Sequence, residues 1–362
     1  MSEYNLNYLD FEQPLLEIEN KIASIKTSAS TSQGDRNKID SLNKELEKNI
    51  TKIFSSLSDW QISQLARHPL RPYTLDYVSN IFDDFVEIHG DRMFGDDKAI
   101  ICGLAKVDGK SIILIGHQKG RDSKDKVFRN FGMPKPEGYR KALRAMKLAE
   151  KFKIPVITFI DTPGAYPGKG AEERGQAEAI AKSIECCLSI SQPIISVVIG
   201  EGGSGGAIAL ATSNRVLMLE HSIYSVISPE GCASILWKDA SKSKEAAESM
   251  QITAQSLYKN QIIDEIINEP LGGAHRNPHQ ASDSIKNSLV GSLNYFVNKS
   301  SSEIIQERKE KFLAIGNKLP EDISVFDTDN VMELSKNKII KNKKVSLFLF
   351  ILFCVGIVWL LY

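Results

Sequence analysis

The chain has 362 residues, which suits about two domains and is long enough to bury a sizeable core. Hydrophobic residues make up 42% and charged residues 25%, a composition that excludes a disordered or collagen-like chain and a polytopic membrane protein. Because 45 Lys and Arg balance 45 Asp and Glu, net charge draws the chain toward neither nucleic acid nor an anionic membrane, and such a partner would need a local patch.

The N-terminal residues show no export signal. The opening MSEYNLNYLDFEQPLLEIEN is acidic and has no basic segment followed by an apolar core, so a signal peptide is not expected. The five cysteines form no CxxC pair, which argues against a zinc ribbon or a disulfide framework. Reduced thiols in a cytoplasmic protein are the expectation.

Residues 1–65 are predicted to form a helical arm. Apolar residues recur at helical spacing on either side of the polar break TSASTSQGDRN, residues 27–37. They are Leu15, Ile18, Ile22 and Ile25 before the break, and Ile39, Leu42, Leu46, Ile50 and Ile53 after it. Two helices are therefore expected, and the arm either packs on a partner or covers the body.

From about Ser111 the sequence has the pattern of an α/β body, and the corresponding domain is expected to span residues 66–320. The apolar runs SIILIG, IPVITFI, PIISVVIG, RVLML and IYSVIS predict buried strands, and helical stretches separate them. Between the second and third runs a helical stripe extends from Ala177 to Leu188. Glu172 and Glu173 are expected in its first turn, where carboxylates suit the helix dipole.

Two glycine-rich loops follow predicted strands. The first is DTPGAYPGKG, residues 161–170, and the second is GEGGSGG, residues 200–206, which precedes a run of small residues. Glycines at a strand end let the backbone approach a ligand closely, and the N–H groups at the start of the next helix then point toward negative charge. A phosphate or an oxyanion is the expected ligand.

Three common motifs overlap these loops. Residues 200–205 satisfy GxGxxG, but no acidic residue ends a convincing strand about twenty residues on, which disfavours a dinucleotide site. DTPG resembles the DxxG of GTPases, but no GxxxxGK[ST] precedes it. Residues 202–206 also fit the GxSxG elbow of a serine hydrolase, with Ser204, Asp264 and His275 in the chain order of the α/β-hydrolases. A glycine turn that only lets a helix pack on a strand is the purely structural alternative.

At these loops the sequence resembles a known family. Six segments, taken in order, are similar to the carboxyltransferase alpha subunit of bacterial and plastid acetyl-CoA carboxylase, and the similarity extends from about Tyr8 to Ile315. The segments are residues 67–77 (RHPLRPYTLDY), 117–144, 159–181, 198–210 (VIGEGGSGGAIAL), 224–239 and 269–278 (EPLGGAHRNP).

The resemblance implies an α/β fold of the crotonase-like (ClpP/crotonase) class, a ββα superhelix in which backbone N–H groups stabilise enolate oxygens of thioesters. It also implies the reaction. A carboxyl group passes from carboxybiotin on a carrier protein to acetyl-CoA, which forms malonyl-CoA for fatty-acid synthesis. Because the ring nitrogen of biotin can take the α-proton, no side-chain base is required, and this agrees with a site built of glycines.

The family's motif also implies roles for particular residues. The backbone of Gly205 and Gly206 is expected to form the oxyanion hole for the ureido oxygen of biotin. The residues expected to shape or line the substrate pocket are Gly202, Gly203, Gly164, Ala165 and Tyr166. For Tyr166 a packing role is an equal alternative.

The resemblance further implies that the active site is shared with a beta subunit. The family assembles as an α2β2 tetramer that works with biotin carboxylase and the biotin carboxyl carrier protein, so a purified single chain should be nearly inactive. A serine hydrolase using Ser204 should instead cleave a thioester alone. A non-catalytic scaffold should show no transfer even in the complete complex.

Residues 118–144 hold nine Lys or Arg and three acidic residues. They either steer the phosphates of CoA or an acidic carrier domain, or form a solvated helix face, and no nucleic-acid reader motif accompanies them. No metal is expected on this chain, because His117 and His275 lack Cys, Asp or Glu at ligand spacing. The family's zinc ribbon belongs to the beta subunit.

Residues 345–362 (VSLFLFILFCVGIVWLLY) carry no charge, follow a polar and lysine-rich linker at 321–344, and lie outside the family pattern. As a helix they span about 27 Å, slightly less than a hydrocarbon core of about 30 Å. The preceding lysines favour a cytoplasmic body. The segment therefore predicts a C-terminal transmembrane helix that anchors the protein to the cytoplasmic face of a membrane.

Overall fold

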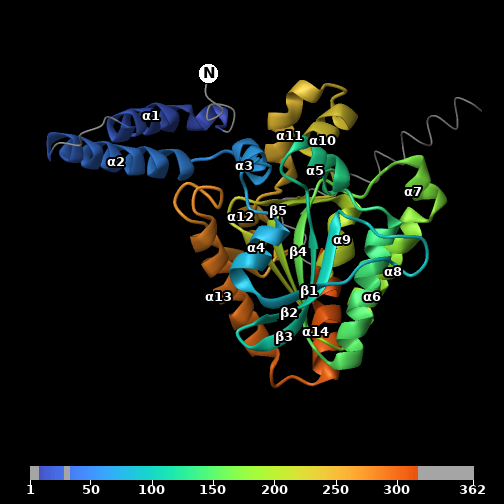
Figure 1. Cartoon of the computed structure of the whole chain (residues 1–362). Helices are drawn as coiled ribbons and strands as arrows, with labels where there is room; N and C mark the ends of the chain where they lie inside the picture. The colour runs from blue at the N-terminus through green and yellow to red at the C-terminus, as the bar shows by residue number, and fades with distance from the viewer. Residues whose placement is uncertain (1–7, 28–32, 317–362) are drawn as a thin grey trace, which may run out of the picture. The chain divides into compact units, whose positions relative to one another are not determined.

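The computed structural model describes residues 8–27 and 33–316. Of these, the residues up to Phe312 form one compact unit, and the description below concerns it. It combines a helical N-terminal region with a mixed sheet covered by helices on both faces (Figure 1). The expected α/β class and the N-terminal helical region are thus confirmed.

The arm is a pair of helices that pack on each other. Helix α1 (Gln13–Thr27) and helix α2 (Gln33–Phe54) follow a short 3-10 turn, η2 (Asp10–Glu12). In the apolar stripe of α1, Leu15, Ile18 and Ile22 are buried, as their spacing predicts, and Ile25 is half-buried. The predicted polar break is shorter in the structure, because residues 33–37 already belong to α2, where Asp35 in the first turn suits the helix dipole.

The sheet has the strand order β1-β2-β3-β4-β5-β6-β8. Strands β1 (Asp83–Glu87), β2 (Ile100–Val107) and β3 (Lys110–His117) are antiparallel. Strands β3, β4 (Val156–Thr162), β5 (Ile194–Gly203), β6 (Arg215–Leu219) and β8 (Glu265–Ile267) run parallel. The final residues of β5 leave β6 and pair with β7 (Ile223–Ser225), so β5 changes partner close to its carboxyl end.

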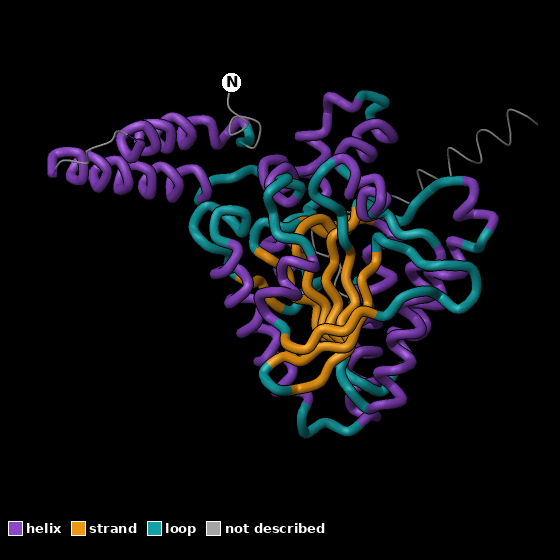
Figure 2. The backbone as a smooth tube through the Cα atoms, viewed as in Figure 1, coloured by secondary structure: helices purple, strands orange, loops and turns teal. Residues whose placement is uncertain are grey.

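Helices lie on both faces of the sheet (Figure 2). Side chains alternate along each strand, so the buried apolar residues divide between these two faces. On β4, Val156 and Ile160 face helices α6 (Pro136–Phe152), α8 (Gln176–Ser189) and α9 (Ser204–Ala211). Ile157 and Phe159 face helices α4 (Thr74–Ile81) and α13 (Pro278–Phe296). All seven residues of β4 are buried, as expected for a parallel strand covered on both sides.

The remaining helices complete the body. They are α3 (Asp59–Ala66), α5 (Ser123–Phe128), α7 (Lys169–Glu173), α10 (Pro229–Leu236), α11 (Ser243–Met250), α12 (Ala254–Lys259) and α14 (Ser301–Ala314), with 3-10 turns η3 (Asn130–Gly132) and η4 (Ala240–Lys242).

The structure corrects one helix start. Glu172 and Glu173 do not lie in the first turn of the helix that spans residues 177–188; they end the separate helix α7. The chain breaks at Gly175, which caps α8 with φ +78°, a conformation that glycine adopts without steric cost.

The predicted transmembrane helix is also corrected. Within residues 8–27 and 33–316, no helix combines the length and the hydropathy needed to cross a bilayer. Residues 345–362, on which the prediction rested, lie outside the described residues.

Candidate active site

The two predicted glycine loops lie side by side at the carboxyl ends of neighbouring parallel strands. The first loop follows β4, and the second ends β5 and begins α9. Thr162 lies opposite Gly202 in the sheet register, so the loops start at the same level. Parallel strands place their carboxyl ends at one edge of a sheet, and this edge is where ligands bind in open α/β sheets.

The second loop packs so tightly on the first that two of its glycines have no room for a side chain. A methyl group on Gly203 would lie 2.3 Å from the carbonyl oxygen of Pro163, and one on Gly206 would lie 2.8 Å from the amide nitrogen of Ala165. These distances are below normal van der Waals contact. The structure thus brings together four of the predicted site residues, Gly203, Gly206, Gly164 and Ala165.

The start of α9 is the candidate anion site. Gly203 caps the helix without a side-chain hydrogen bond, and no acidic residue stands in the first turn. The first N–H groups of a helix have no partner within the helix and carry partial positive charge, so they can stabilise an oxyanion. Ser204 and Gly205 are partly exposed, whereas Gly206 is buried.

Gly202 shapes the loop from the other side. It pairs with Tyr224 of β7, and a methyl group at this position would lie 2.9 Å from Cδ2 of the Tyr224 ring. Burial raises the pKa of Tyr224 to about 12, so the ring stays neutral and serves as a packing surface.

Tyr166 lies at the far end of the first loop. Its N–H donates to the carbonyl of Pro134 and its carbonyl accepts from Nε2 of Gln176, each at 3.0 Å. Lys135 Nζ lies 5.5 Å from the centre of the ring, and a methyl group on Gly168 would lie 2.4 Å from Cε1 of the ring. The ring is packed by its neighbours, and a role in binding substrate stays a prediction.

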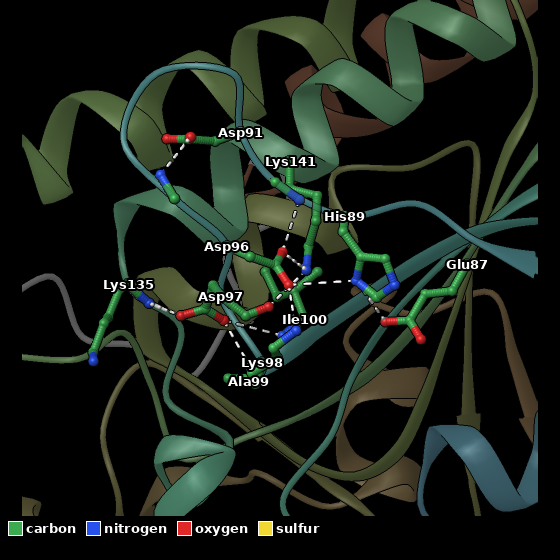
Figure 3. A network of polar contacts seen from close by, with 12 residues as sticks. Glu87, His89, Asp91, Asp96, Asp97, Lys98, Ala99, Ile100, Lys135 and Lys141 are labelled. Carbon is green, nitrogen blue, oxygen red and sulfur yellow. Dashed lines mark hydrogen bonds and ion pairs between the residues drawn. The ribbon is translucent and has the colours of Figure 1, made fainter.

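A buried polar network holds the segment that Tyr166 contacts (Figure 3). Lys141 Nζ, on a side chain 1% exposed, lies 2.7 Å from Asp96 Oδ1 and 2.6 Å from the carbonyl oxygen of Asp97. Asp97 Oδ2 accepts from the N–H of Lys135 at 2.9 Å, directly before α6. Burial opposes the charge on Asp96, but hydrogen bonds from Lys141 and Lys98 outweigh it and hold the pKa of Asp96 below its usual value.

Charged residues at the start of the loops were not assigned individual roles from the sequence. Lys119 Nζ lies 2.7 Å from Asp161 Oδ1, and Arg67 Nη2 lies 2.8 Å from Glu201 Oε1. A signal was available, because Asp161 and Glu201 directly follow apolar runs at strand ends, where a charged residue needs a partner.

His117 is a buried neutral residue next to these charges. It ends β3, and its Nδ1 lies 3.4 Å from the amide nitrogen of Asp161. Burial lowers the pKa of His117 to about 3, so the imidazole carries no charge at neutral pH.

The residues of the predicted hydrolase triad are dispersed. Ser204 has φ +56°, as in a nucleophile elbow, but His275 Nε2 lies 3.1 Å from Glu12 Oε1 in the arm. Asp264 accepts from the N–H of Val216 at 2.6 Å and pairs with Lys311. Triad chemistry needs these side chains within hydrogen-bond reach of one another, and they serve other partners.

His275 lies next to a carboxylate and a second histidine. The sequence predicted no such neighbours, because none occurs at ligand spacing along the chain. Its ring stacks on that of His68 at 4.0 Å between centroids, and the ligand atoms of Glu12, His68 and His275 lie within 4.8 Å of one another. His68 Nδ1 accepts from the N–H of Leu70 at 3.1 Å, and His68 Nε2 lies 3.6 Å from Glu12 Oε2. With the contact between His275 Nε2 and Glu12 Oε1, these interactions join the arm to the body.

Most cations of the basic stretch at 118–144 serve internal contacts. Arg121 Nη1 donates to the carbonyls of Pro69 and Arg71 at 3.0 and 2.8 Å. Arg144 Nη2 donates to the carbonyl of His89 at 2.7 Å. Together with Lys119 and Lys141, these contacts join the stretch to neighbouring segments, and they leave fewer charges for a ligand than the sequence count indicates.

Comparison with known proteins identifies the group to which this site belongs. Residues 8–316 match the family model described as acetyl co-enzyme A carboxylase carboxyltransferase-like. The acetyl-coenzyme A carboxylase carboxyl transferase subunit alpha of Vesicomyosocius okutanii is 56% identical over 317 residues, 86% of this chain and 98% of that protein. The same subunit of Xanthomonas oryzae pv. oryzae is 54% identical over 313 residues, again 86% of this chain and 98% of that protein.

Solved structures share the fold at low sequence identity. A transcarboxylase 12S structure aligns at TM-score 0.51 and 20% identity, over 62% of this chain and only 41% of that one. A Pseudomonas malonate decarboxylase hetero-tetramer in complex with coenzyme A aligns at TM-score 0.51 and 15% identity, over 68% of this chain and 93% of that one.

The chain therefore belongs to the acetyl co-enzyme A carboxylase carboxyltransferase family. Within it, the similar curated proteins are alpha subunits, and the function predicted from the sequence, a carboxyltransferase alpha subunit, is confirmed. The serine hydrolase alternative is not favoured.

Proposed function

We propose that this chain supplies one of the two oxyanion sites for transfer of a carboxyl group from carboxybiotin to acetyl-CoA. The single observation that carries the proposal is the start of α9, where a glycine turn without a side-chain cap leaves helix N–H groups at the edge of the sheet. We assign the N–H groups of Gly205 and Gly206 to the ureido oxygen of biotin. We also take the body as crotonase-like, which agrees with the change of partner at the end of β5.

The chain's own residues perform a limited task in this reaction. Biotin, when carboxylated on its carrier, supplies the carboxyl group. The glycine backbone binds and orients an oxygen on which negative charge develops, and such a donor is worth about 10²–10³ in rate. Gly164 and Ala165 pack against Gly206 and are assigned to the wall of this position, with Tyr166 beyond them. No general base is assigned to a side chain, since His117 is fully buried and its low pKa of about 3 makes it a weak base, and Lys119 is paired with carboxylates.

We infer that the second oxyanion site comes from another chain. A thioester enolate also needs stabilisation, and one helix start serves one oxygen. We assign this role to a beta subunit in an α2β2 assembly, with the biotin carboxyl carrier protein and biotin carboxylase as further partners. The names of the relatives, which are subunits of a carboxylase, support this assignment.

Reconstitution tests the proposal. The full chain is combined with beta subunit, carboxylated carrier protein and acetyl-CoA, and malonyl-CoA is measured. We expect transfer only with both subunits, loss of transfer in Gly206→Pro, which removes the N–H donor, and substantial retention in Ser204→Ala. Thioester cleavage by the single chain, abolished in a folded Ser204→Ala variant, would instead establish the hydrolase.

A further inference from the structure

Three buried charges lie at or just after the carboxyl ends of three neighbouring strands, where the second loop starts. Lys119 follows β3, Asp161 belongs to β4 and Glu201 to β5. Lys119 Nζ lies 2.7 Å from Asp161 Oδ1 and 3.4 Å from Glu201 Oε2, and the three side chains are only 15%, 3% and 10% exposed. One ammonium group therefore joins the carboxyl ends of adjacent strands at the level where the glycine loops begin.

Asp161 in turn fixes the backbone that leads into the second loop. Its Oδ1 accepts from the N–H of Glu201 at 3.0 Å. A methyl group on Gly200 would lie 2.5 Å from the same oxygen, so the backbone at residues 200–201 is pressed against this carboxylate. Directly after this contact, β5 pairs with β7 through residues 201–203 and then enters α9 at Ser204. The contact lies where the chain changes direction toward the proposed oxyanion site.

The network is held firmly on its other sides. Arg67 Nη2 lies 2.8 Å from Glu201 Oε1, and Arg67 Nη1 lies 2.7 Å from Glu230 Oε1 at the start of α10. The stem of Lys119 is confined as well, because a methyl group on Gly132 would lie 2.6 Å from its Cγ. Burial disfavours the ammonium form of Lys119, but the charges of Asp161 and Glu201 outweigh burial and raise its pKa. Lys119 thus stays a cation and is unsuited to act as a base.

We propose that Lys119 is a positioning residue: by joining Asp161 to Glu201 it fixes the end of β5, and with it the N–H groups of Gly205 and Gly206. The inference rests on the proposed function of those N–H groups. A loop held in this way is preorganised for the transition state, so its loosening lowers kcat more than it weakens substrate binding. A displacement of about 1 Å at such a position can cost about 10²-fold.

The test uses the complete complex with beta subunit and carboxylated carrier. In Lys119→Met we expect kcat for malonyl-CoA formation to fall about 10²-fold while KM for acetyl-CoA changes little. Lys119→Arg, which restores a cation able to reach both carboxylates, should recover most of kcat. The matched control is Lys311→Met, the same substitution in a Lys–Asp pair on α14 at the opposite end of the strands, which should leave kcat near the wild-type value.

Thermal melting and beta-subunit binding identify a variant that fails to fold. In that case Asp161→Asn serves instead, because its amide oxygen can still accept from Glu201 while the negative charge is lost; kcat should again fall with KM retained. The inference would be overturned if a folded Lys119→Met complex kept the wild-type kcat or changed only in KM. It would also be overturned if Lys311→Met lost as much kcat as Lys119→Met. Absence of transfer by the wild-type complex would instead refute the proposed function, and the inference would fall with it.

Discussion

Gly206 lies against Ala165 so closely that a methyl group on Gly206 would fall 2.8 Å from the amide nitrogen of Ala165. This contact between the start of α9 and the first glycine loop gives Gly206 a steric requirement that Gly205 lacks. A methyl group on Gly205 would meet its nearest neighbour, Ile180, at 3.8 Å, an ordinary contact distance.

Gly206→Ala should therefore separate the two loops and lower carboxyl transfer by about 10²-fold, the effect of misplacing a catalytic group. Gly205→Ala serves as the folding control, and its melting temperature should stay near that of the wild type. Malonyl-CoA formation and thermal melting of both variants check the prediction. Full activity in Gly206→Ala would show that the contact between the loops is not required.

Lys141 and Lys98 both pair with Asp96, at 2.7 Å each, but Lys141 is 1% exposed and Lys98 is 36% exposed. Lys141→Met should lower the free energy of unfolding by about 3–5 kcal/mol, because it leaves buried oxygens of Asp96 and Asp97 without their cation. Lys98→Met should cost at most about 1 kcal/mol, as for an exposed pair. Urea unfolding of the two variants provides the comparison, and equal losses would refute the role of burial.

His117 should make stability depend on pH. Its pKa is about 3 in the folded protein because of burial, and the unfolded chain titrates near 6.5. The stabilisation is complete above about pH 6.5 and is lost as pH falls toward the folded value, by at most about 1.4 kcal/mol per pH unit. His117→Asn, which keeps an acceptor near the N–H of Asp161, should flatten this slope in denaturant titrations between pH 4.5 and 7. An unchanged slope would contradict the assignment.

Glu12 should hold the arm on the body in a pH-dependent way. Burial disfavours its charge, but hydrogen bonding and charge interaction with His275 outweigh burial and lower the pKa of Glu12. The contribution is present above the unfolded value of about 4.3 and is lost as pH falls through the lower folded value. Hydrogen exchange of α1 and α2 should therefore increase in acid, and Glu12→Gln should show similar exchange already at pH 7. Glu17→Gln, an exposed change on α1, is the control.

The local sequence pattern was sufficient to predict the strands and helices that bury a continuous apolar run or stripe. The run RVLML forms β6 over the same residues, because a strand buried on both faces needs consecutive apolar residues. The helical stripe at 177–188 lies in α8, because a helix buried along one side needs apolar residues at helical spacing. The antiparallel pair β1 and β2 was missed, since β1 (DDFVE) is mostly acidic and Gly103 and Lys106 interrupt the apolar residues of β2.

The sequence by itself determined the family, the class of fold and the two glycine loops, because these are properties of consecutive residues. Only the tertiary structure decided which distant residues meet. It placed Ala165 against Gly206, joined Lys119 to Asp161 and Glu201, and moved His275 from a supposed triad to a contact with Glu12 in the arm. The physical reason is that a buried charge pairs with whichever group the packed strands bring within reach, and two backbone segments touch only where the fold places them together. Neither choice can be read from the spacing of residues along the chain.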